Sequence, residues 1–145
     1  MNFLKAGMHK LPEYMQLRQA VESNALPAVA TGLSGIHKAT IINALVQDTN
    51  KTALLLAADE AEAQRICQDL TSMGLRSFIY PTRDFTFRNV ESASREYEHQ
   101  RIQVLSRILK HDCDVVVACM DAALQYTIPP NELEGRMIEL KKGQT

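Results

Sequence analysis

Short apolar runs alternate along the chain with segments of helical periodicity, and this alternation restricts the fold more than any other feature. The two clearest runs are residues 52–58 and 114–119, and shorter ones occupy residues 28–31 and 77–80. Continuous apolar runs of this length are typical of strands that are covered on both faces. The pattern therefore predicts an α/β fold, a three-layer αβα sandwich around a mainly parallel sheet of four strands.

The intervening segments predict helices with recognisable ends. Asp59 followed three residues later by Glu62 resembles a capping box, and Gly74 is a suitable C-terminal glycine for the same helix. Ser94 is expected to cap the longest helix. The expected helices are residues 12–24, 38–47, 60–73, 94–110 and, as one short turn, 121–126.

Composition excludes several classes of protein. The formal net charge is −1, which argues against a general nucleic-acid binder. Cys67, Cys113 and Cys119 are odd in number and lack a CxxC spacing, so we expect reduced, buried thiols rather than a disulfide framework or a zinc site. The N-terminal residues resemble neither a signal peptide nor a membrane span, so we expect a cytoplasmic protein with no membrane partner.

The turn after the first apolar run resembles a phosphate-binding loop that has lost two positions. Gly32 and Lys38 fit the motif, and Gly35 lies between them, but His37 stands where the sixth-position glycine belongs. Ala39 stands where a hydroxyl would hold Mg²⁺. We interpret Gly32, Gly35 and Lys38 as a degenerate loop that is a structural remnant or, alternatively, a weak phosphate site. No catalytic residue, metal site or cofactor is expected.

The second half of a hydrolytic site is also missing from the sequence. No apolar strand ends in an Asp-Glu pair, and Asp121 follows its strand two residues late, so we interpret Asp121 as a helix cap. The histidines His9, His37, His99 and His111 have no spacing that would gather them. These absences favour a binding module over an enzyme.

Two polar segments allow more than one interpretation. Residues 82–93 carry the aromatic and basic side chains Phe85, Phe87, Arg83 and Arg88, which could stack on single-stranded nucleic acid but more often belong to an ordinary surface loop. The charged residues of the longest helix are expected to form a solvated face with local ion pairs: Arg95, Glu96, Glu98 and Arg101.

The order of several segments is similar to a known family. The markers are GLSG at residues 32–35, DEAEAQR at 59–65, Gln100-Arg101, and ALQYTIPP at 123–130. Together they resemble the N-terminal part of the bacterial transcription-repair coupling factors (Mfd), whose first domain is similar to the excision-repair helicase subunit UvrB. The resemblance implies a UvrB-like domain over residues 1–135, with residues 136–145 beginning a strand that leads to a second domain.

Further expectations follow from this resemblance alone. The family displaces stalled RNA polymerase with an ATP-driven DNA translocase and recruits excision repair through UvrA. The resemblance implies that the ATP-binding motor and most of the UvrA-binding and polymerase-binding surfaces lie outside this chain, which is then an incomplete copy. It also implies contacts with the other domains of the full-length protein, weak or no DNA binding, and a scaffold role. A small nucleotide-binding P-loop protein and a single-stranded nucleic-acid module remain the alternatives.

Overall fold

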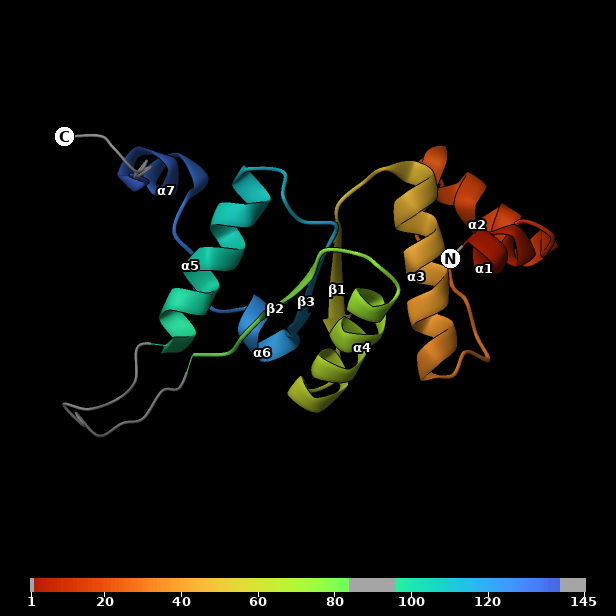
Figure 1. Ribbon diagram of the computed structural model, residues 1–145, viewed down its shortest axis with the longest axis horizontal. Helices are drawn as coiled ribbons and strands as arrows, with labels where there is room; N and C mark the ends of the chain where they lie inside the picture. Colours follow the sequence, from red (N-terminus) through yellow and green to blue (C-terminus); the bar gives the residue numbers. More distant parts are fainter. Residues whose placement is uncertain (1, 84–95, 139–145) are drawn as a thin grey trace.

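The computed structural model describes residues 2–83 and 96–138, with side chains from residue 5 onward, and it is a mixed α/β structure. Its strands lie at the centre of the molecule, with α1 and α2 at one end and α7 at the other (Figure 1). The elements in chain order are α1 (Asn2–Met8), α2 (Pro12–Glu22), α3 (Gly35–Thr49), β1 (Ala53–Ala57), α4 (Glu60–Ser72), β2 (Ser77–Tyr80), α5 (Glu96–Leu109), β3 (Val115–Cys119), α6 (Met120–Ala123) and α7 (Pro130–Arg136).

The sheet is parallel and has β3 at its centre. Its strand order is β1-β3-β2, with Leu55 of β1 and Ile79 of β2 both in register with Val117. All five residues of β3 are buried, as a central parallel strand requires. Alternate β3 side chains enter different cores: Val115 and Val117 pack with α3 and α4, and Val116 packs on the other face with α5 and α6. Helices therefore cover both faces of β3.

Helix α4 begins as the sequence predicts. The Asp59 side chain accepts a hydrogen bond from the Glu62 backbone N–H at 2.7 Å, which is half of a capping box. Gly74 has a φ of +91°, a left-handed conformation that glycine adopts without steric cost. The buried face of the helix consists of Ala63, Ile66, Cys67 and Leu70.

The three cysteines are free and buried, as predicted. Burial raises the pKa of the thiols of Cys67 and Cys113.

The predicted first strand is wrong. Residues 28–31 form no strand, and the Val29 side chain is 85% exposed. An isolated strand leaves its N–H and C=O groups without ladder partners, and within the described residues no strand lies beside this segment. The described sheet therefore has three strands in place of four.

The two ends of the chain also depart from expectation. Helix α1 was not predicted, and α6 ends at Ala123, three residues before the predicted end of the short helix. Arg136, expected to open a strand, is the last residue of α7. Met137 and Ile138 form no strand either, while residues 139–145 lie outside the described residues, as does the expected cap Ser94.

Arg101 was expected on a solvated face, and this prediction is wrong. Its side chain is buried at 3% exposure, and its guanidinium carbon lies 3.9 Å from the centre of the Tyr80 ring. Its Nη1 donates hydrogen bonds to the carbonyl oxygens of Pro81 and Ala122 at 2.7 and 3.3 Å. One arginine thus joins α5 to the end of β2 and to α6. Arg95, from the same predicted face, lies outside the described residues.

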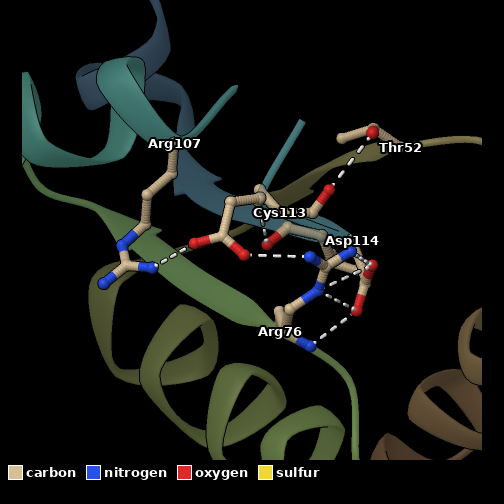
Figure 2. A network of polar contacts seen from close by, with 7 residues as sticks. Thr52, Arg76, Arg107, Cys113 and Asp114 are labelled. Carbon is tan, nitrogen blue, oxygen red and sulfur yellow. Dashed lines mark hydrogen bonds and ion pairs between the residues drawn. The ribbon is translucent and has the colours of Figure 1, made fainter. Parts of the chain in front are cut away.

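A network of charged side chains fixes the N-terminal ends of β2 and β3 (Figure 2). The Arg76 backbone N–H donates to Asp114 Oδ2 at 2.8 Å, and its guanidinium lies 2.6 Å from Asp114 Oδ1 and 2.9 Å from Asp112 Oδ1. Arg107 of α5 reaches the other oxygen of Asp112 at 2.8 Å. Hydrogen bonds and charge from Arg76 hold the pKa of Asp114 below its ordinary value.

This depressed pKa predicts a specific pH dependence. Because the folded-state pKa of Asp114 lies below the unfolded value of about 3.9, the Arg76–Asp114 contact stabilises the fold above that pH, and its contribution is lost as the pH falls through the folded-state value. Arg76→Met should raise the Asp114 pKa and weaken the fold at pH 7, with the difference from the wild type closing in acid. Carboxyl titration by NMR measures the Asp114 pKa, and urea unfolding at pH 7 and pH 3 measures the stability.

Arg136→Met is the control, because it removes an exposed ion pair on α7. An unchanged Asp114 pKa in Arg76→Met contradicts the prediction.

Candidate functional site

The segment that the sequence analysis interprets as a degenerate phosphate loop lies between residues 28–31 and the first turn of α3. Gly32 has a φ of +75°, so a glycine is needed there for the backbone conformation. Gly35 is the first residue of α3, and a Cβ added at Gly32 or at Gly35 would meet no atom within 4 Å. Neither glycine is needed for close packing. The loop is open on the side where these side chains would project.

Lys38 is engaged by a carboxylate of the same chain. Its Nζ lies 3.0 Å from Glu62 Oε1 in the first turn of α4. The other oxygen of Glu62 accepts a hydrogen bond from the Ala58 backbone N–H at 3.0 Å. The Ala58 N–H, followed by Lys38, keeps the pKa of Glu62 below its ordinary value. The lysine that would bind a phosphate is therefore neutralised by a carboxylate that is itself fixed at the end of β1.

The position that should carry the metal-binding hydroxyl faces the protein core. Ala39 is 0% exposed and belongs to the cluster that includes Leu70 and Val117. The neighbouring Thr40 hydroxyl donates to the Ile36 carbonyl at 2.8 Å, one turn back along α3. Both observations follow from helix geometry, since position 40 lies about 100° further round the helix than position 39. The loop therefore presents no free hydroxyl at position 39 or 40.

His37 lies on the exposed side of the same turn. A hydrogen bond of 3.1 Å joins its Nδ1 to the hydroxyl of Ser34, the residue before the helix. Ser34 makes no side-chain capping bond to the backbone of α3. The imidazole and the hydroxyl thus satisfy each other at the place where a working loop would leave backbone N–H groups open to an anion.

A hollow lies beside the C-terminal ends of the three strands. It has a volume of about 330 Å³, and its lining includes Asp59, Glu60, Cys119 and Asp121. Asp121 was expected to cap a helix, but the capping position of α6 is occupied by Cys119 and Asp121 lies in the first turn. Within residues 2–83 and 96–138, no group of His, Cys, Asp and Glu side chains is arranged to hold a metal ion.

Most of residues 82–93, interpreted as an ordinary surface loop with single-stranded nucleic-acid binding as the alternative, lies outside the described residues. This undescribed part includes Phe85, Phe87 and Arg88. Arg83 is described, and its backbone N–H donates to the Gln125 side chain at 2.9 Å, which anchors the start of the loop to the segment after α6. Across the described ranges, no helix has the length and apolar character to cross a bilayer.

Comparison with known proteins finds a relative among the transcription-repair-coupling factors. The transcription-repair-coupling factor of Bacillus subtilis (strain 168) is 32% identical to it over 104 residues, which is 70% of this chain. The match confirms the resemblance to the transcription-repair coupling factors. The chain spans only 9% of the length of that relative. No family model matches the chain, and no solved structure matches it.

Sequence reasoning located the loop but missed the partner of its lysine. The sequence identified Glu62 only as part of a capping box. Its backbone N–H donates to Asp59, while its side chain accepts from the Ala58 N–H and pairs with Lys38. The available signal was the first turn of α4, because it directly follows β1 at the edge where phosphate loops of parallel sheets also lie. A carboxylate at that edge is close enough to meet the lysine of the preceding helix.

Proposed function

We propose that this chain is a non-catalytic interaction module of a transcription-repair coupling factor, with the UvrB-like fold of a degenerate P-loop domain. The similarity to the Bacillus subtilis factor supports the family. The pairing of Lys38 with Glu62 is the single observation that carries the non-catalytic role. In this proposal the loop is a structural connection between β1, α3 and α4, and no cofactor binds to it.

Electrostatics oppose nucleotide binding at this loop. A phosphate loop binds nucleotide through backbone N–H groups, a free lysine charge and a hydroxyl on Mg²⁺. Here a nucleotide would have to displace the Glu62 carboxylate from Lys38, and that carboxylate is also held by the Ala58 N–H. The buried methyl group of Ala39 offers the metal no ligand. Each change removes part of the binding energy, and together they leave little for ATP.

The interaction role is supported by apolar surface on the sheet. Leu54 and Leu56 of β1 are exposed, although parallel strands are usually covered on both faces. Contiguous exposed apolar surface usually marks a contact with another protein segment. We assign this surface to contacts with the rest of the full-length factor. Displacement of RNA polymerase, recruitment of UvrA and ATP-driven movement on DNA are assigned to regions beyond this chain.

Calorimetry with ATP and Mg²⁺ tests the proposal. The wild-type chain is expected to show no saturable binding at nucleotide concentrations up to about 1 mM, a limit that corresponds to a binding free energy weaker than about −4 kcal/mol. A micromolar Kd that disappears in Lys38→Ala but persists in Lys110→Ala, a lysine outside the loop, would establish a small nucleotide-binding protein instead.

A further variant separates the effect of the ion pair from that of the lost motif positions. Glu62→Ala frees Lys38 and leaves His37 and Ala39 unchanged. We expect this variant still to bind no ATP at 1 mM, because the metal ligand and the sixth-position glycine remain absent. Micromolar binding by Glu62→Ala would mean that the carboxylate alone blocks a working site.

A further inference from the structure

The first two helices are held on α3 around one buried carboxylate. Asp48 lies in the last turn of α3, and its side chain is 3% exposed. Donors from the N-terminal segment converge on it. Lys5 Nζ lies 2.8 Å from Oδ1, and the contacts to Oδ2 are His9 Nε2 at 2.7 Å, the Tyr14 hydroxyl at 2.7 Å and Arg18 Nη1 at 3.7 Å.

The position of this carboxylate is unfavourable without its partners. An acidic group near the C-terminus of a helix is destabilised by the helix dipole, and the last turn of α3 contains no basic residue. Burial alone would raise the pKa of Asp48, but hydrogen bonds from Lys5, Tyr14 and His9 outweigh it and hold the pKa well below the ordinary value. The donors that stabilise the buried carboxylate of Asp48 therefore come from α1, α2 and the turn between them.

Apolar packing beneath the same helices is thin. Tyr14 is the buried residue of α2, while Leu11 and Met15 are exposed. An open hollow of about 590 Å³ lies between α2, residues 28–31 and Ile41 of α3. The apolar contact of α2 with this part of the fold is therefore incomplete, with Leu17 and Val21 only half-buried. Asp48 lies about two turns further along α3 than Ile41, in the last turn of the helix, where the polar contacts are concentrated.

We propose that α1 and α2 form a unit that detaches from α3 while the sheet stays folded, and that the charge on Asp48 is the latch that holds it. This inference is independent of the proposed function. Local opening is set by the contacts that a segment makes with the rest of the fold. The polar contacts of α1 and α2 are concentrated on the side chain of Asp48, so this one residue controls how firmly the two helices attach to α3.

Native-state hydrogen exchange of the whole chain tests the latch. In Asp48→Asn, the amide hydrogens of α1 and α2 are expected to exchange at least about tenfold faster, while those of β1 and β3 keep their wild-type rates. The matched control is Asp112→Asn, which removes a carboxylate that also joins two basic side chains but lies in the network of Figure 2. It should leave the exchange of α1 and α2 unchanged.

A second variant covers the case in which Asp48→Asn fails to fold. Tyr14→Phe removes one hydrogen bond to Asp48 and keeps the ring and the ion pairs, so exchange in α1 and α2 should rise by a smaller factor with the sheet unaffected. The proposal is overturned if protection in α1 and α2 is unchanged in both variants. It is equally overturned if either variant lowers protection in α1, α2 and the sheet by the same factor, because the helices are then part of one cooperative unit.

Discussion

Replacing Arg101 with alanine is expected to destabilise the domain by about 3 kcal/mol, in the range measured for large-to-small changes in protein cores. The substitution removes a buried side chain that lies over the Tyr80 ring and leaves a cavity there. It also leaves the carbonyl oxygen of Pro81 without the Arg101 donor, whereas the Ala122 carbonyl still accepts from the Gln125 backbone N–H. A buried acceptor that loses its partner costs about 1–3 kcal/mol. Urea unfolding followed by circular dichroism measures the loss.

A methionine at the same position separates the two contributions. Burial lowers the pKa of the Arg101 guanidinium, and within the described residues no carboxylate pairs with it. Arg101→Met fills most of the space and removes this unpaired charge, so it should cost roughly half as much as Arg101→Ala. Arg136→Ala, on the exposed face of α7, is the control. Equal stability of Arg101→Ala and this control contradicts the structural role.

Arg101 also shows where sequence reasoning stops. Helical spacing predicts Arg101 on the same helix as Val104, but an arginine on a charged helix is usually solvated, which favours the wrong environment here. Its burial depends on the Tyr80 ring and on two carbonyl groups from other elements. No local pattern records these partners, because they are brought together only when β2, α5 and α6 pack.

The strands show the same limit, since β1 and β3 were predicted correctly and the strand at residues 28–31 was not. The runs that became β1 and β3 are apolar throughout, which is typical of parallel strands, although β3 is buried on both faces and β1 leaves Leu54 and Leu56 exposed. Residues 28–31 have the same local character, yet the segment forms no strand because none of the described strands lies beside it. A strand requires a partner edge, and a single apolar run carries no information about that edge. The capping box of α4 was predictable because both of its residues lie within one turn.

For the candidate site, the sequence predicted which residues depart from a phosphate loop but not what replaces the ligand. His37 and Ala39 are recognised by position in the motif alone. The ion pair between Lys38 and Glu62 joins residues from two helices that flank β1. Its formation depends on how α3 packs on α4, which only the tertiary structure shows.

Leu70→Ala is expected to be about as damaging as Arg101→Ala, with a loss of about 3 kcal/mol of unfolding free energy. Leu70 is 0% exposed and packs in the core between α4 and the sheet, together with Val115 and Val117. The backbone N–H of Leu75 also donates to the Leu70 carbonyl at the end of α4. Because the site lies where the helix turns toward β2, its neighbours cannot collapse easily into the space.

The comparison that tests this expectation uses a second leucine. Leu124 is 77% exposed after α6, and Leu124→Ala removes the same atoms with almost no change in buried area. Its unfolding free energy should differ from that of the wild type by no more than about 0.5 kcal/mol. Since both substitutions have the same chemistry, the difference between them measures burial alone. A loss in Leu70→Ala no larger than in Leu124→Ala would mean that the core between α4 and β3 does not hold the sheet together.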